Sequence, residues 1–349
     1  MQRAMTRTLA VAALVLAGQG LWAVGAVADS PLTTIDPSGA MITYEPVLVV
    51  GDPSGTPSDL PSYHVDANVS TSLYAGVGSI YSVSDLGLAT LGTGTLIGSR
   101  YVLTAAHLFD TNNDGQNDFP LSGISFILND SGNQSHTIGV SALDIHPDFD
   151  GFNNPLGTVN DDLAILTLAE DAPTGVPVYD LWPDEITTIQ TITLVGYGRS
   201  GNGVAGFTIG ASKTVKRVGW NQLDAHFLDD EGSGAFEVWE GDFDDPTGAG
   251  SNYLGGESLG NALEVTLGHG DSGGPTFIQD GDGYLYLVGN NTFLVSFSGG
   301  PSAPKFDSGL GGILLYPYLG WIDSVVPEPA TMALLALGAG LVLARRRRR

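Results

Sequence analysis

Turn-forming residues divide the sequence into short apolar runs, and this pattern constrains the fold more than any other feature. The chain of 349 residues has 49 glycines and 19 prolines, and runs rich in Val, Ile, Leu, Thr and Tyr lie between them. Such runs between turn residues are typical of strands, whereas interior glycine and proline weaken helices. The sequence therefore predicts an all-β fold. A hydrophobic content of 42% is enough for the core of one large or two small domains.

Apolar patterning places individual strands along the body of the chain. We expect strands at residues 74–81, 92–97, 101–104, 163–168 and 191–195, and a hairpin in which 285–288 pairs across the turn at 280–283. Residues 318–325 favour a single short helix.

The N-terminal residues have the pattern of an export signal. Arg3 and Arg7 precede the apolar run 9–16, and residues 26–28 are small residues suited to cleavage before Asp29. We predict a signal peptide at 1–28, because the apolar run is too short and interrupted for a membrane anchor. Residues 29–73, rich in Pro, Ser, Asp and Gly apart from the apolar patch 47–50, are predicted to be a propeptide or an N-terminal extension on the surface.

The C-terminal end combines three features in order: Val-Pro-Glu-Pro at 326–329, an apolar run at 330–344, and five arginines at 345–349. This order resembles the PEP-CTERM sorting signal of Gram-negative bacteria, within 326–349. The resemblance implies processing by an exosortase and a cell-surface or extracellular location. We expect 330–344 to act as a transient transmembrane segment with the arginines on the cytoplasmic side, although 15 residues span only about 22 Å as a helix. The alternative is a plain C-terminal anchor.

The exported body is strongly acidic. Only six of the 13 basic residues lie between the two ends, whereas nearly all 38 acidic residues do, and the formal net charge is -25. This charge excludes nucleic-acid binding as a function. The chain has no cysteine, so an oxidising compartment cannot crosslink it, and size, a β core and bound metal are the remaining means of stabilisation.

Three separate segments suit the three roles of a serine hydrolase. They are Leu-Thr-Ala-Ala-His at 103–107, Asn-Asp-Asp-Leu-Ala-Ile-Leu at 160–166, and Gly-Asp-Ser-Gly-Gly-Pro at 270–275. A serine hydroxyl is a weak nucleophile until an imidazole removes its proton, and the imidazole needs a carboxylate to fix its tautomer. His107, Asp162 and Ser272 are therefore candidate catalytic residues.

Together with Gly-Tyr-Gly at 196–198, these segments resemble the trypsin/chymotrypsin-like serine peptidases over residues 74–325. The resemblance implies two antiparallel β-barrels with the catalytic groups in the cleft between them. It also implies that Ser272 is the nucleophile, His107 the general base and Asp162 its orienting carboxylate. The backbone amides of Gly270 and Ser272 would then form the oxyanion hole.

Other acidic and imidazole groups are alternatives for these roles. Asp161 precedes the same strand as Asp162, but alternation places the two on opposite faces, and the register favours Asp162. His269 lies beside the oxyanion loop and is predicted to be a wall of the substrate cleft. The remaining assignments are structural or surface roles for His64, His136, His146 and His226, and a solvated loop at 229–245.

Asp271 departs from the family pattern because it has no evident partner. In many relatives the matching carboxylate pairs with a new N-terminal amine freed by cleavage after a basic residue, but no Lys or Arg lies between Arg7 and Arg100. A buried carboxylate needs a partner. We expect Arg199 to supply it, with cleavage before residue 75 or 76 by another peptidase as the alternative.

The primary specificity pocket also differs from that of trypsin. Thr266 occupies the floor position, six residues before Ser272, and an uncharged floor favours an apolar or small side chain over Lys or Arg. The substrate-binding strand, usually Ser-Trp-Gly, corresponds to Thr292, Phe293 and Leu294, with 296–298 as the alternative.

A loop directly after His107 has the ligand spacing of a calcium site. Glycine stands at loop position six, and Leu121 stands at position twelve, where a bidentate Glu would complete an EF-hand cage. The alternative is a polar turn-rich loop. The candidate calcium ligands at positions one, three, five, seven and nine are Asp110, Asn112, Asp114, Gln116 and Asp118.

These observations predict an exported, surface-sorted serine endopeptidase that acts on polypeptides and requires no cofactor, apart from calcium as a structural ion. The alternative from another class is a catalytically inactive surface or matrix protein that binds polypeptides with the same fold. An esterase would use the same three residues.

Overall fold

The computed structural model describes residues 32–35, 41–44, 48–151 and 159–326. The predicted signal peptide, the Pro-Glu-Pro motif, the apolar run 330–344 and the arginine tail lie outside this part of the chain. None of the helices among the described residues has the length and hydropathy needed to cross a bilayer.

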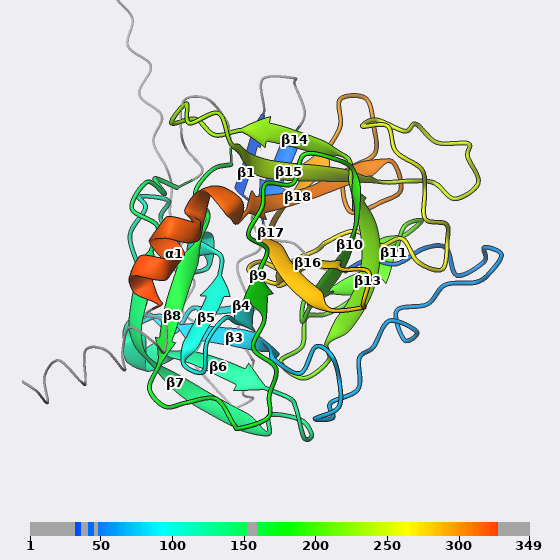
Figure 1. The fold of residues 1–349 in the computed structure, drawn as a ribbon. Helices are drawn as coiled ribbons and strands as arrows, with labels where there is room; N and C mark the ends of the chain where they lie inside the picture. Colours follow the sequence, from blue (N-terminus) through cyan, green and yellow to red (C-terminus); the bar gives the residue numbers. More distant parts are fainter. Residues whose placement is uncertain (1–31, 36–40, 45–47, 152–158, 327–349) are drawn as a thin grey trace, which may run out of the picture.

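Six antiparallel strands close the first barrel, in the order β3-β4-β5-β8-β7-β6 (Figure 1). Its strands are β3 (Val77–Val83), β4 (Ala89–Leu96), β5 (Tyr101–Thr104), β6 (Ile124–Leu128), β7 (His136–Ile145) and β8 (Ala164–Leu168). Inward apolar residues fill the barrel, and Gly78 lets the ring of Phe126 cross the strand, since a Cβ at this glycine would lie 2.5 Å from the ring. Burial of this apolar face holds the barrel together.

The second sheet is a half-barrel that follows the path β13-β10-β16-β17-β18-β15-β14. These strands are β10 (Gln190–Gly196), β13 (Arg217–Leu223), β14 (Ala225–Leu228), β15 (Phe236–Phe243), β16 (Pro275–Gln279), β17 (Leu285–Ser296) and β18 (Ser308–Leu314). Three short strands pair at its margin: β1 (Leu32–Ile35) pairs with β2 (Met41–Tyr44), and β2 and β9 (Asp180–Leu181) pair with β17. A separate hairpin joins β11 (Ser200–Asn202) to β12 (Gly206–Ile209).

The only α-helix in the described residues, α1 (Leu319–Val325), follows the 3-10 turn η3 (Tyr316–Tyr318), and its Trp321 ring lies 4.9 Å from that of His146, which follows β7 (Figure 1). Ile322 is buried there, and Trp321 packs against the same core. Two further 3-10 turns are η1 (Ala106–Leu108) and η2 (Leu121–Gly123). The predicted fold class, a mostly β protein of chymotrypsin-like architecture with a short C-terminal helix, is confirmed.

Two sequence predictions need correction. The strand predicted at 285–288 continues to Ser296, because its apolar pattern is buried on both faces rather than alternating. The acidic stretch 229–245 is not wholly a solvated loop, since β15 occupies Phe236–Phe243 and buries Glu237, Glu240 and Asp242. Charged residues gave this strand a polar appearance, but its aromatic and β-branched residues pair it with β14 and β18.

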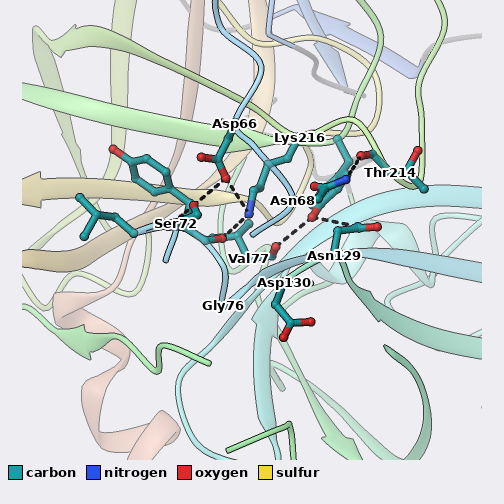
Figure 2. Close-up of polar contacts among 12 residues, drawn as sticks. Asp66, Asn68, Ser72, Gly76, Val77, Asn129, Asp130, Thr214 and Lys216 are labelled. Carbon is teal, nitrogen blue, oxygen red and sulfur yellow. Dashed lines mark hydrogen bonds and ion pairs between the residues drawn. The ribbon is translucent and has the colours of Figure 1, made fainter. Parts of the chain in front are cut away.

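The N-terminal extension is attached to the body by a buried lysine (Figure 2). The Nζ atom of Lys216 lies 3.0 Å from Asp66 Oδ2 and donates to the carbonyl of Tyr74 at 2.5 Å, and Ser72 Oγ donates to the same Oδ2 at 2.7 Å. Burial lowers the pKa of Lys216, and the charge of Asp66 opposes this effect. The described part of the extension therefore packs on the second sheet, and its removal as a propeptide stays a prediction.

Candidate active site

His107 lies in the 3-10 turn that follows β5, between the first barrel and residues 270–275, the nucleophile loop that carries Ser272. Ala105 and Ala106 before it are fully buried, so their small side chains let this turn approach the second sheet closely. Gly273, in the loop that carries Ser272, lies against the same turn with φ 76°, and a Cβ at this position would lie 2.0 Å from Thr104 Oγ1. The two motifs, Thr-Ala-Ala-His and Asp-Ser-Gly-Gly, therefore have small residues at the point where their segments are in contact.

The structure brings the three candidate catalytic side chains into one hydrogen-bonded row. His107 Nδ1 lies 2.7 Å from Asp162 Oδ2, and His107 Nε2 lies 2.9 Å from Ser272 Oγ. The backbone amide of His107 donates to Asp162 Oδ1 at 2.8 Å, so both carboxylate oxygens are engaged by one residue. With a proton on Nδ1 facing the carboxylate, Nε2 is left to accept the serine proton.

Asp162, and not Asp161, faces the imidazole. Asp162 is 0% exposed, and its backbone carbonyl accepts a hydrogen bond from Asn290 Nδ2 at 3.0 Å. Asp161 has a left-handed backbone, φ 55°, and its Oδ1 lies 3.0 Å from Nδ1 of His146 instead. The two neighbouring carboxylates therefore point to different histidines before β8 begins at Ala164.

Two backbone amides next to Ser272 are available to a developing oxyanion. Within the described residues, the amides of Gly270 and Ser272 donate no hydrogen bond to the protein. Gly270 has φ 108°, a conformation that glycine adopts readily. Thr93 fixes the loop, because its Oγ1 donates to the Gly270 carbonyl at 2.8 Å and its amide donates to the Ser272 carbonyl at 2.9 Å.

The cation that acts on Asp271 is Arg217, so the prediction of Arg199 is wrong. Asp271 is fully buried, which raises its pKa to about 8, while a hydrogen bond from the Gly198 amide at 3.0 Å and the charge of Arg217 lower it. Arg217 pairs opposite Gly196 in the sheet, and a Cβ at that glycine would lie 1.8 Å from Asp271 Oδ1. The guanidinium of Arg199 instead lies 4.9 Å from the centre of the Phe207 ring.

The N-terminal residue whose amide reaches Asp271 is Leu48, not residue 75 or 76. The amide of Leu48 also lowers the pKa of Asp271, although Asp271 Oδ2 has no partner at hydrogen-bond distance within the described residues. Leu48 is buried, and the next residue, Val49, forms a β-bridge with Thr266. Gly76 lies elsewhere, against the carbonyl of Pro177, where a Cβ would come within 2.0 Å.

The predicted pocket residues lie at different depths in the structure. Thr266 and Thr292 are 0% exposed, and Thr292 Oγ1 donates to Asn290 Oδ1 at 3.1 Å. The Phe293 ring is buried in the core against Gly311, where a Cβ would lie 2.3 Å from it. His269 is partly exposed, 5.0 Å from the Phe207 ring, so these two rings lie together next to the nucleophile loop.

In the predicted calcium loop the carboxylates bind the loop itself. Asp110 accepts from the amides of Asn113 and Gly115 at 2.6 and 2.7 Å, and Asp118 Oδ2 accepts from the Thr111 hydroxyl at 2.6 Å. The Thr111 hydrogen bond lowers the pKa of Asp118. This is the geometry of a turn-rich polar loop. Calcium binding stays a prediction, tested by whether calcium raises the melting temperature of the native chain but not of Asp114→Ala.

Comparison with known proteins agrees with this architecture. The family model of the trypsin-like peptidase domain matches residues 92–289, more than half of the chain, and this span contains all three members of the row. The PEP-CTERM protein-sorting motif matches residues 325–349, which implies export, surface association in Gram-negative bacteria and exosortase processing. No curated protein matches the sequence significantly. The chain belongs to the family of trypsin-like peptidase domains and ends in a PEP-CTERM sorting motif.

Proposed function

We propose that this protein is an exported serine endopeptidase that hydrolyses peptide bonds through an acyl-enzyme on Ser272. The hydrogen-bonded row of Asp162, His107 and Ser272 carries the proposal. Ser272 Oγ attacks the substrate carbonyl carbon while His107 Nε2 takes the hydroxyl proton. The C–N bond then breaks, and His107 returns that proton to the leaving amine. Water, deprotonated by the same imidazole, hydrolyses the ester and releases the acid.

The amides of Gly270 and Ser272 support this reaction because they lack acceptors in the described chain. They would donate to the oxygen of the tetrahedral intermediate, and removal of one such donor typically costs about 10² to 10³ in kcat. A peptidase fold that had lost catalysis would have no need to keep these donors open next to an intact row. This observation favours the enzyme over the polypeptide-binding alternative.

The substrate preference that we propose follows from the uncharged floor. Thr266 is buried, and the pocket assignment by resemblance to the family places no carboxylate at this position. A substrate Lys or Arg would be buried without a counter-charge, which is unfavourable. We therefore propose apolar or small side chains at the cleaved position.

We further propose that the segment before Leu48 is a propeptide that occupies the substrate edge of β17. Residues 41–44 in β2 pair antiparallel with Phe293–Ser296, directly beyond the point where the Asn291 carbonyl accepts from the Gly273 amide at 2.8 Å. An extended substrate bound to Thr292–Leu294 would use the same backbone groups. β2 and substrate would then compete for one strand edge.

Cleavage before Leu48 would add a second effect at Asp271. The Leu48 amide already acts on this carboxylate, so a new α-ammonium at Leu48 would pair with it, as the resemblance to the family implies. Three chains separate the two effects: one beginning at Asp29, one at residue 45, which lacks β1 and β2, and one at Leu48. We expect kcat/KM to rise at each step. Equal values for the first two chains would contradict the role of β2.

Cleavage of a peptide library tests the proposed function itself. The native chain beginning at Leu48 should cleave library peptides after apolar or small residues, and Ser272→Ala should cleave none. Ester substrates run in parallel identify an esterase, which would hydrolyse esters but no peptide. A folded native chain that cleaves neither class would favour the polypeptide-binding alternative.

A further inference from the structure

We propose that His146 and Asp161, with the carboxylates of Asp148, Asp230 and Glu231, bind one divalent transition-metal ion. The ion would lie at the residue next to Asp162, whose carboxylate faces His107. It would link the first barrel to the loop between β14 and β15. Sequence reasoning assigned His146 a structural or surface role, and the peptidase chemistry does not use it. The proposed ion is distinct from calcium in the loop at 110–118.

Ligand atoms from three separate segments converge on Asp161. Ligand atoms of His146, Asp148 and Asp161 all lie within 4.8 Å of one another, and so do those of Asp161, Asp230 and Glu231. His146 and Asp148 follow β7, Asp161 precedes β8, and the last two belong to the loop between β14 and β15. Asp161 is common to both sets, so it is the central ligand.

The imidazole of His146 is the observation that points to an ion rather than to an acidic surface. Its side chain is only 9% exposed, and Nδ1 lies 3.0 Å from Asp161 Oδ1 but forms no hydrogen bond with correct geometry in the described chain. Tyr318 and Trp321 pack edge-on against the ring, at 4.8 and 4.9 Å, and hold it in this orientation.

Glu237 adds a buried carboxylate with one oxygen that has no hydrogen-bond partner in the described residues. It is 0% exposed, its Oε1 accepts from the Asp161 amide at 2.8 Å, and its Oε2 has no hydrogen-bond partner in the described residues. The single hydroxyl proton of Tyr318 faces both this Oε1 and Asp161 Oδ1 and can be donated to only one of them. Two buried carboxylates therefore share one donor.

The charges around Glu237 reinforce this conclusion. The ligand atoms of Asp161, Asp230 and Glu231 lie within 4.8 Å of one another, and the carboxylate of Glu237 lies against Asp161. A dication among these groups would offset their mutual repulsion.

The donor set selects the class of metal. Carboxylates alone suit calcium or magnesium, but an imidazole together with carboxylates suits zinc or manganese. Because Asp161 is joined to Asp162 by one peptide bond, an ion here would fix the backbone that presents the triad carboxylate to His107. It would act as a positioning element and would not contact substrate.

Zinc binding to the Ser272→Ala chain tests the proposal without any dependence on peptidase activity. After treatment with EDTA, calorimetric titration should show one zinc ion per chain. His146→Gln and Glu231→Gln should each weaken zinc binding at least about tenfold. Matched controls are His136→Gln and Glu257→Gln, which remove an imidazole and an exposed carboxylate outside the cluster and should leave the affinity unchanged.

Glu231 lies on an exposed loop, so its variant should keep the native circular dichroism spectrum even if His146→Gln unfolds. Zinc affinity in Glu231→Gln equal to that of the controls would overturn the site, as would absence of zinc binding in the Ser272→Ala chain. Calcium bound in preference to zinc would overturn the assignment to a transition metal.

Discussion

Replacing Asp162 by Asn should inactivate the protein by reversing the tautomer of His107. The backbone amide of His107 can only donate, and it lies 2.8 Å from one oxygen of this side chain. It therefore holds the Asn oxygen on that side and turns the NH₂ group toward Nδ1, which is 2.7 Å away in the native protein. Nδ1 must then accept, so the proton moves to Nε2, and Nε2 can no longer take a proton from Ser272.

The size of the effect follows from the loss of general-base catalysis. In a serine triad this wrong tautomer lowers kcat by about 10⁴, which corresponds to about 5.5 kcal/mol of transition-state stabilisation. Steady-state hydrolysis of the best library peptide should show the loss in kcat with little change in KM. Asp171→Asn is the matched control, because its carboxylate pairs with Arg100 on the surface. An Asp162→Asn variant that keeps a third of native kcat would refute the reasoning.

Three further predictions concern stability and backbone fit. Burial raises the pKa of Asp271 to about 8 and that of Asp244 to about 7, so the native state keeps protons that the unfolded chain releases above pH 4. In urea denaturation of EDTA-treated protein, the free energy of unfolding should therefore fall as the pH rises from about 5 to 8. A rise over this range would contradict the burial argument. Lys216→Met should lower the free energy of unfolding by about 3 kcal/mol, because it leaves the carboxylate of Asp66 without its charge partner. Adding Asp66→Asn should restore part of this loss. If the losses of the two single variants simply add in the double variant, the pairing is excluded. Gly273→Ala should abolish fluorophosphonate labelling of Ser272, while thermal unfolding stays a single transition, because the new Cβ would displace the nucleophile loop. Retained labelling would show that the close approach at this glycine is not needed.

The sequence predicts the hydrogen-bonded row of His107, Asp162 and Ser272 because each member lies in a local motif. The residues before His107 and after Ser272 are small, and the structure shows these segments in contact at Gly273. The apolar strand after Asp162 fixes its position relative to β8. For the same reason most predicted strands, and the short helix at the end, lie within a few residues of their observed positions.

Partners that meet across the sheet could not be predicted in this way. Arg217 acts on Asp271 through its charge, since β13 pairs with β10 in a register that places Arg217 opposite Gly196, and no local pattern encodes this register. Arg199 is closer to the Gly-Tyr-Gly motif in sequence, which made it the natural but wrong choice.

The cluster around His146 escaped notice for a related reason. Asp161 and Glu237 lie 76 residues apart in the sequence, and Glu237 lies in a stretch whose charges suggest solvent exposure. One signal was present in the sequence: Asp161 stands next to a catalytic candidate without a role of its own. An unexplained carboxylate beside an active-site motif is worth testing for a partner.

Covalent labelling of Ser272 examines whether the aligned imidazole, carboxylate and hydroxyl make a reactive nucleophile. A fluorophosphonate should add once to the folded native chain, and peptide mass spectrometry should map the adduct to Ser272. The adduct should be lost in Ser272→Ala and formed far more slowly in Asp162→Asn, while Asp171→Asn reacts at the native rate. A folded native chain beginning at Leu48 that forms no adduct, or one that reacts at another serine, would contradict the proposed nucleophile.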